Sequence, residues 1–209
     1  MAEGRRTAAQ ARLRLARRAA FAAGALPLAL VGWRLWQGAY EPDPIAALAD
    51  ETGEWALRVL LATLAMRPLR RLTGWRWPLA VRRTLGLWAF AWASLHLGVY
   101  AGLDQYGIWA EIPRDVLERP FVLAGFAGWL LLVPLAVTST RGWMRRLGAR
   151  WQRLHRLVYA VAALALLHQW WIVAPKADLT RPLAYLVAFL FLMALRLPAA
   201  RVAARLRRA

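Results

Sequence analysis

Cysteine is absent from the 209 residues of this chain. Without thiols, the chain cannot form disulfides, zinc–thiolate sites or iron–sulfur clusters. Acidic residues are also scarce, with 11 against 29 lysines and arginines, and only three histidines occur. The resulting net charge of +18 would favour nucleic acid as the partner of a soluble protein. The basic residues lie between long apolar blocks, however, so no nucleic-acid partner is expected.

Apolar residues make up 60% of the chain and gather in six blocks. Several blocks approach the roughly 20 residues needed to cross a hydrocarbon core of about 30 Å. Because lipid offers the backbone no hydrogen bonds, such blocks are expected to be helices. The sequence predicts an all-α bundle of six transmembrane helices, at about residues 19–37, 46–66, 82–103, 119–138, 150–173 and 180–197.

Charge alternates from one connection to the next. Basic residues precede the first block, follow the sixth, and lie between the second and third and between the fourth and fifth. Every acidic residue except Glu3 lies in or beside the other connections. This positive-inside pattern predicts that both termini are cytoplasmic. It divides the chain into a basic N-terminal segment 1–18, a transmembrane domain 19–197 in the lipid bilayer and a basic tail 198–209. No internal repeat is evident.

Tryptophan is abundant, with 13 residues. Many of them fall near the expected ends of the spans, as is typical of an aromatic belt at the membrane interface. Contact with a cofactor is the alternative for the tryptophans that lie near a histidine.

Two of the three histidines are expected at equal depth in the membrane. A ligating side chain inside a span is costly and indicates function, although a lone histidine can also be a hydrogen-bonded helix contact. His96 lies 13 residues after Arg83, and His168 lies 12 after Arg156, on helices expected to run in the same direction. At ~1.5 Å per residue, each lies about 18–20 Å from the inner boundary.

Two imidazoles at one depth on parallel helices are what a bis-histidine haem requires. The small residues around His96 and before His168 would let the helices admit a flat macrocycle. A zinc or non-haem iron site is less well matched, because no carboxylate or thiolate lies nearby. The sequence therefore predicts that His96 and His168 are the axial ligands of a haem iron, an arrangement suited to electron transfer.

His155 is expected near the inner boundary, between Arg153 and Arg156. Three interpretations remain open for this group. In the first, His155 is a haem ligand paired with an inner-side methionine. In the second, it forms with the two arginines a second cofactor site that binds flavin, quinone or a haem propionate. In the third, it is a structural residue at the membrane interface.

Three stretches of sequence carry a family resemblance. They are TGEWALR at 52–58, RRTLGL at 82–87 with WASLH at 92–96, and LAVTSTRGW at 135–143 with WQRLHRLVY at 151–159. Over residues 20–195 the chain resembles the MsrQ (YedZ) family, the haem-binding membrane subunits of a periplasmic methionine-sulfoxide reductase system. All three histidine positions are present.

The resemblance implies a ferric-reductase-like transmembrane fold in the bacterial inner membrane, with haem b. It implies an electron-transfer subunit that serves MsrP, a periplasmic molybdenum enzyme that reduces oxidised methionines and so repairs proteins. The implied donor is the quinone pool or, since this chain has no room for a flavin and nicotinamide domain, a separate cytoplasmic flavin reductase. FMN is a further cofactor implied by the resemblance alone.

Other functions remain open at this point. A ferric-reductase-like carrier could serve another acceptor, and a membrane scaffold could contain structural histidines. A transporter could use His96 and His168 for substrate or proton. Neither expected helix carries the Pro- or Gly-broken centre or the second intramembrane charge typical of transport pathways.

Overall fold

The computed structural model describes residues 2–176 and 178–196, and within these ranges it contains helices and no strand. The predicted all-α class is confirmed. The long helices are α1 (Ala2–Trp36), α2 (Pro44–Thr73), α3 (Trp77–Val99), α5 (Pro120–Val137), α8 (Val158–Val173) and α9 (Thr180–Ala194). Short elements are the π-helix Tyr100–Asp104, α4 (Ile112–Glu118), α6 (Arg141–Leu147), α7 (Ala149–Leu154) and the 3-10 turns His155–Leu157 and Ala174–Lys176.

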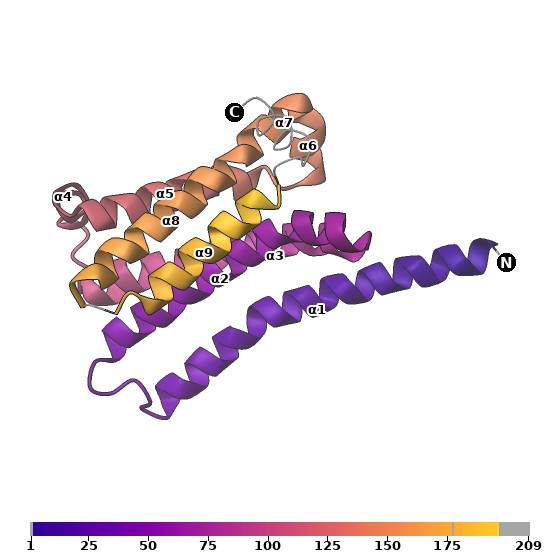
Figure 1. Cartoon of the computed structure of the whole chain (residues 1–209). Helices are drawn as coiled ribbons and strands as arrows, with labels where there is room; N and C mark the ends of the chain where they lie inside the picture. Colours follow the sequence, from indigo (N-terminus) through magenta and orange to yellow (C-terminus); the bar gives the residue numbers. More distant parts are fainter. Residues whose placement is uncertain (1, 177, 197–209) are drawn as a thin grey trace.

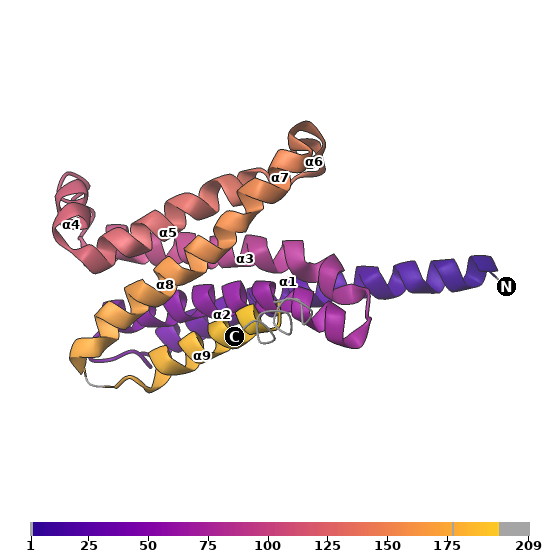
Figure 2. The ribbon, with the colours of Figure 1, turned by 45° about the horizontal axis from the view of Figure 1, so that its top comes forward.

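The long helices lie side by side, and the N-terminal part of α1 extends beyond the ends of the others (Figure 1). α2 packs mainly against α3, and α5 mainly against α8, so the chain contains two helical hairpins. α1 lies against α3, and α9 contacts both α8 and α2. Figure 2 shows α8 running obliquely to α2 and α9. Side chains of both hairpins, one from each half of the chain, therefore face each other between the hairpins.

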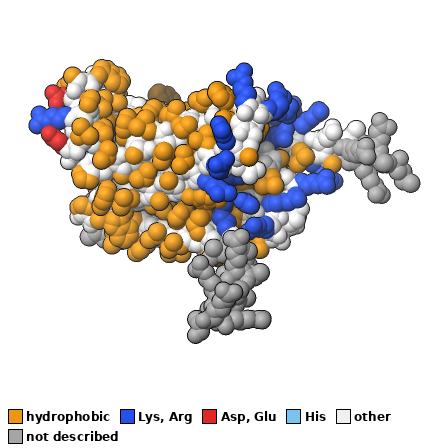
Figure 3. Space-filling view, turned by 90° about the horizontal axis from the view of Figure 1, so that it is seen from above, with side chains coloured by type: hydrophobic (Ala, Val, Ile, Leu, Met, Phe, Trp, Pro, Cys, Tyr) orange, Lys and Arg blue, Asp and Glu red, His pale blue; other side chains and the backbone are white. Residues whose placement is uncertain are grey.

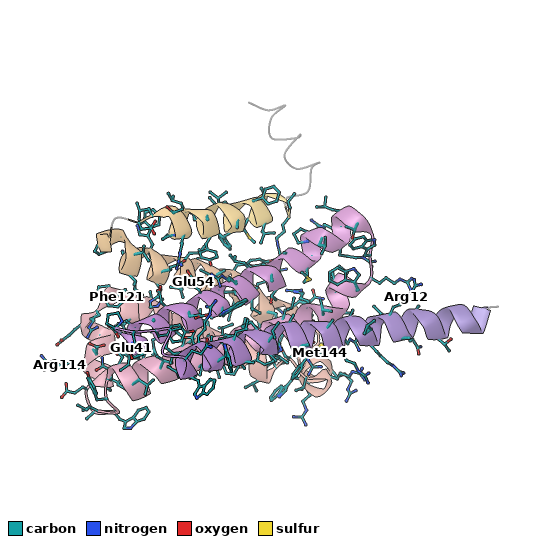
Figure 4. All side chains as sticks on the ribbon, turned by 90° about the horizontal axis from the view of Figure 1, so that it is seen from below. Arg12, Glu41, Glu54, Arg114, Phe121 and Met144 are labelled. Atoms are coloured by element: carbon teal, nitrogen blue, oxygen red, sulfur yellow. The ribbon has the colours of Figure 1, made fainter. Side chains whose placement is uncertain are left out.

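The two ends of the molecule differ in charge. The loop before α2, the short helix α4 and the turn before α9 share one end, whereas α6, α7 and the beginning of α1 lie at the other (Figure 1). Glu41 and Arg114 accordingly lie far from Arg12 and Met144 (Figure 4). Apart from Glu3, the acidic residues lie in or beside the connections at the first end, which is called the acidic end. The other is called the basic end.

Apolar side chains cover much of the surface between these ends (Figure 3). Soluble proteins rarely expose apolar patches of this extent. On α9, Leu183, Val187 and Phe191 are 44–62% exposed. Among the described residues, three helical segments are long and apolar enough to cross a membrane, namely Ala9–Trp36, Pro120–Val137 and Ala149–Val173, while Thr180–Ala194 is apolar but shorter. The predicted membrane character is confirmed.

Several helix boundaries differ from those predicted. α1 begins at Ala2 instead of near residue 19, so residues 2–18 continue the first helix. α2 begins where predicted, because Asp43 accepts a hydrogen bond from the backbone N–H of Ala46 and Pro44 occupies the first turn. It continues to Thr73, and Gly74 ends it in the left-handed conformation at φ 71°. The predicted tail 198–209 lies outside the described residues.

Pro68 does not end α2 as the sequence suggested. Proline has no N–H, so the carbonyl of Leu64, one turn earlier, loses its usual helical donor. That carbonyl accepts a hydrogen bond from the guanidinium of Arg196, which follows α9. A side chain distant in sequence thus satisfies the backbone group that proline leaves free, and the helix continues.

Tryptophans occupy two environments in the structure. Trp36, Trp75 and Trp109, near helix ends, are 55–76% exposed, as expected of an interfacial belt. Trp92 is only 1% exposed and lies in the core beside Leu64, which is 0% exposed. Its indole N–H donates to the carbonyl of Gly24 at 3.1 Å and so ties α3 to α1.

Candidate functional site

His96 and His168 meet between the two hairpins. His96 lies in the last turn of α3, and His168 lies in the second half of α8. Their ring centroids are 5.9 Å apart, and the ring planes form an angle of 76°. The equal depth predicted from the sequence is therefore matched by direct proximity of the two rings. Both lie toward the acidic end of the bundle.

Each of these histidines is fixed through the same ring nitrogen. The Nδ1 atom of His96 lies 2.9 Å from the carbonyl oxygen of Ala49 on α2. The Nδ1 atom of His168 lies 2.6 Å from the carbonyl oxygen of Phe121 on α5. A carbonyl can only accept, so both Nδ1 atoms donate, and each Nε2 retains its lone pair. Metal-ligating histidines are commonly oriented in this way.

Glycines make room for both rings. A Cβ atom at Gly125 would lie 2.8 Å from Cε1 and Nδ1 of His168. A Cβ atom at Gly53 would lie 3.1 Å from Cε1 of His96. The first distance is a clash and the second is tighter than ordinary contact, so α2 and α5 approach the imidazoles where only glycine fits. The glycines, backbone carbonyls and histidines together form a cradle that holds two unprotonated Nε2 atoms.

The two hairpins share this construction. In both hairpins the carbonyl residue and its histidine are 47 residues apart. In both, the glycine lies one helical turn after the carbonyl residue, at Gly53 after Ala49 and at Gly125 after Phe121. The sequence indicated no internal repeat, because the residues between these positions differ. The structure shows that the two ring-binding units are nevertheless built alike.

Hydrogen-bonded side chains surround the histidine pair. Thr52, fully buried, places its hydroxyl oxygen 3.4 Å from Nδ1 of His96 and donates to the carbonyl of Leu48. The indole of Trp129 on α5 donates to Ser94 on α3 at 3.0 Å. These contacts connect α2, α3 and α5 around the rings and fix their relative positions.

Ion pairs close the acidic end of the bundle. Glu51 binds Arg34 at 3.0 Å and also accepts a hydrogen bond from Tyr40. Burial, together with the neighbouring carboxylate of Glu51, raises the pKa of Tyr40. Glu54 binds Arg181 at 2.8 Å and also pairs with Arg58. α1, α2 and α9 are thereby joined close to the histidine pair, and Figure 4 shows Glu54 on the ribbon.

His155 is oriented through the opposite ring nitrogen. It lies in the turn between α7 and α8, and its Nε2 is 3.0 Å from the hydroxyl oxygen of Thr138. That hydroxyl donates to the carbonyl of Pro134 at 2.6 Å, so it accepts from His155. Trp151 stacks on the imidazole with centroids 4.0 Å apart and donates to the carbonyl of Thr138. The lone pair of His155 is therefore on Nδ1.

The predicted inner-site arginines lie next to His155 in the chain but do not bond to its ring. Arg153 and Arg156 are exposed, and neither forms a hydrogen bond or ion pair within the described part of the chain. A further charge that acts on the imidazole is that of Arg82 on α3. Sequence reasoning missed this residue because it treated Arg82 only as part of a basic connection. It also missed Gly53 and Gly125, whose positions one turn after the carbonyl residues acquire meaning only once the hairpins are paired.

A multi-ligand metal centre is not formed by the described residues, among which no group of three or more His, Cys, Asp or Glu side chains converges. The two free Nε2 atoms, the flanking helices and the apolar, aromatic surroundings instead fit a haem held by one imidazole on each face. The fit rests on the cradle itself. The carbonyls of Ala49 and Phe121 orient the two rings, and the helix backbone at Gly53 and Gly125 packs closely against them.

Comparison with known proteins gives consistent matches. The family described as "Ferric reductase like transmembrane component" matches residues 52–166. This range contains the α2–α3 hairpin from Thr52 onward, α5, and α8 up to Leu166. No solved structure matches the chain.

Similar curated proteins cover most of the chain. One from Xanthomonas euvesicatoria is 51% identical over 170 residues, which are 78% of this chain and 77% of the relative. One from Xanthomonas campestris is 50% identical over 176 residues, with 81% and 80% covered. One from Rhodospirillum rubrum is 50% identical over 190 residues and covers 90% of both chains. Each is named "Protein-methionine-sulfoxide reductase heme-binding subunit MsrQ".

Proposed function

We propose that this chain, which belongs to the MsrQ family of haem-binding subunits and contains its ferric-reductase-like transmembrane component, is a membrane electron carrier for a periplasmic methionine-sulfoxide reductase. The observation that carries the proposal is the meeting of His96 and His168 with both Nε2 lone pairs free. In this role it supports the repair of oxidised periplasmic proteins and passes electrons to a separate catalytic subunit.

The proposed topology has six membrane helices and both termini in the cytoplasm of a bacterium. The helices are α1, α2, α3, α5, the continuous segment of α7 and α8, and α9. The separation of acidic from basic residues between the two ends supports this orientation in the inner membrane. Lysines and arginines gather toward one end of the surface in Figure 3. The histidine pair would then lie in the periplasmic half of the bilayer.

In the proposed mechanism, His96 and His168 are the residues that would hold haem b. The haem would supply one-electron transfer, and bis-histidine ligation in an apolar site suits that task better than oxygen chemistry. The carbonyls of Ala49 and Phe121 hold the Nδ1 protons and leave the Nε2 atom of each ring available as a ligand. Helices α2 and α5 exclude water from the rings, and Gly53 and Gly125 permit their close approach.

The proposed electron path begins at the cytoplasmic side and ends at MsrP. The donor is quinol from the respiratory pool or a cytoplasmic flavin reductase, and FMN would serve as a second cofactor. A site for it near His155 is compatible with the free Nδ1 atom of that residue. Arg153 and Arg156 remain part of this proposed inner site, and Arg82, whose charge also acts on His155, is added to it.

Haem binding is tested by spectroscopy on the purified protein. A Soret band with reducible visible bands is expected, whereas a colourless preparation would favour a transporter or scaffold. Replacing His96 or His168 with Ala should remove most of the haem measured per protein by a pyridine assay. His155→Ala is the matched control and should retain a substantial share. Full haem retention in H168A would overturn the proposed ligand pair.

A further inference from the structure

Two partly buried arginines lie near the basic end of the bundle without a counter-ion. Arg82 of α3 is half-buried, yet its guanidinium forms no hydrogen bond or ion pair with any described residue. Arg196, directly after α9, is also half-buried, and its Nε atom is buried without a partner in the described structure. Removing a charge from water is costly unless an opposite charge compensates it, so two partly buried guanidinium groups without a counter-ion favour the binding of an anion.

Tyr159 of α8 connects the two arginines. Its hydroxyl accepts a hydrogen bond from Arg196 at 2.5 Å, and the guanidinium lies 5.2 Å from the centre of its ring. Arg82 also lies within electrostatic range of Tyr159. The exposed Arg67 of α2 acts on both Arg82 and Arg196. Four helices therefore contribute to one cluster of three cations and a phenol, here called the inner arginine cluster.

The described part of the chain supplies no carboxylate to this cluster. Every ion pair found there joins residues of the acidic end, and among the acidic residues only Glu3 lies on the N-terminal half of α1. Arg196 is also held in place from the protein side, since the carbonyl of Leu64 fixes one nitrogen and Arg71 donates to the Arg196 carbonyl at 3.2 Å. Arg196 is thus positioned before any anion binds.

We propose that the inner arginine cluster is a binding site for a phosphate group, framed by Arg82 and Arg196 with Arg67 at its rim. Guanidinium groups present several donors in a fixed plane and match phosphate oxygens. Basic pockets between helix ends on the cytoplasmic side are suited to the headgroups of anionic lipids. The phosphate comes from such a lipid or from a free phosphate compound. This inference does not depend on haem binding.

The test compares Arg82→Gln, Arg196→Gln and the matched control Arg153→Gln in the full-length protein. Arg153 is an exposed arginine of α7 at the same end, and it forms no ion pair with the described residues. Arg82→Gln is the decisive variant, since Arg82 forms no hydrogen bond or ion pair with a described residue, so the substitution removes a charge and breaks no such bond. Arg196→Gln also frees the carbonyl of Leu64, so its folding is checked by helical circular dichroism.

Binding is measured as retained phosphatidylglycerol by native mass spectrometry, and as thermal stabilisation in phosphatidylcholine nanodiscs by added phosphatidylglycerol or inorganic phosphate. R82Q should weaken binding about tenfold or more, the loss expected for one charged hydrogen bond, while R153Q should not. A response to the lipid alone identifies a headgroup, and a response to inorganic phosphate identifies a free anion. Equal binding by R82Q and R153Q would overturn the proposal, as would loss of haem from R82Q without any change in phosphate binding.

Discussion

At the scale of single residues, the histidine pair is defined as much by its neighbours as by its ligand atoms. Nδ1 of each ring is engaged by a backbone carbonyl, and a glycine stands behind each ring. A carbonyl acceptor leaves one tautomer available, so in the proposed haem site the ligating nitrogen would be selected before haem binds. His155 differs because its acceptor, Thr138, engages Nε2 instead. The same residue type therefore serves different purposes at the two depths.

Gly125→Ala should impair haem binding without replacing a ligand. The added Cβ would lie 2.8 Å from His168, and an overpacked core of this kind costs about 1–3 kcal/mol. Because the ring must move to relieve the clash, we expect G125A to lose most of its haem and to show a shifted Soret band.

Gly128→Ala is the control for this prediction. Gly128 lies on α5, like Gly125. A Cβ atom at Gly128 would lie 3.6 Å from Leu164 of α8, which is an ordinary van der Waals contact. The variant should retain haem at the wild-type level. Equal haem content in the two variants would show that the close approach of α5 to His168 is not required.

At the scale of elements, the connection between α3 and α5 is the longest at the acidic end. Tyr106 and Trp109 are 82% and 68% exposed, and Tyr106 has a positive φ of 51° beside Gly107 at 71°. The backbone thus turns sharply and presents two aromatic rings outward. A membrane-interface anchor and a docking contact for a periplasmic partner both fit such a surface.

Replacing Tyr106 and Trp109 together with Ser should slow electron transfer to MsrP about fivefold to tenfold, the effect of losing a contact worth 1 kcal/mol or more. Haem content should be unchanged, because neither Tyr106 nor Trp109 forms a hydrogen bond or ring contact with His96 or His168 in the described structure. Stopped-flow oxidation of the reduced haem by MsrP measures the rate. Leu117→Ser, 75% exposed on neighbouring α4, is the control. An unchanged rate in the double variant would leave the loop as an anchor only.

At the scale of the whole molecule, the proposed topology would displace the histidine pair from the membrane centre. Counted from Leu103 and Val173, a haem at this pair would lie about 10 Å from the outer boundary, and the inner boundary would be ~20 Å away. An outer acceptor would then be near, whereas a soluble inner donor would be distant. Either a second inner cofactor near His155 bridges the difference, or a lipid-soluble quinol reaches the haem within the bilayer.

In membrane vesicles, quinol should reduce the haem without any soluble reductase, and a quinone-site competitor should block that reduction. The visible spectrum follows the reaction. Reduction of the haem only by a cytoplasmic flavin reductase would contradict this prediction and favour an inner bridging cofactor. His155→Ala would then slow reduction by that enzyme, whereas it should not affect a quinol-driven reaction.

The sequence alone determined the helical class, the membrane environment and the family resemblance, and it predicted that His96 and His168 form a pair. Composition, block length and motif order are local properties, so no knowledge of packing was needed. The beginning of α1 and the end of α2 were predicted wrongly. Pro68 indicates a boundary only when nothing else satisfies the carbonyl that it leaves without a donor. Arg196 does so from the other end of the chain.

Only the tertiary structure decided which atoms surround the three histidines. The carbonyls of Ala49 and Phe121, the paired glycines and the inner arginine cluster come from segments far apart in sequence. A backbone carbonyl carries no residue signature, and a glycine has no side chain whose pattern can be recognised. Arg82 and Arg196 likewise belong to basic segments that the positive-inside pattern already explains. Their placement within one cluster depends on the packing of α2, α3, α8 and α9, which local sequence does not encode.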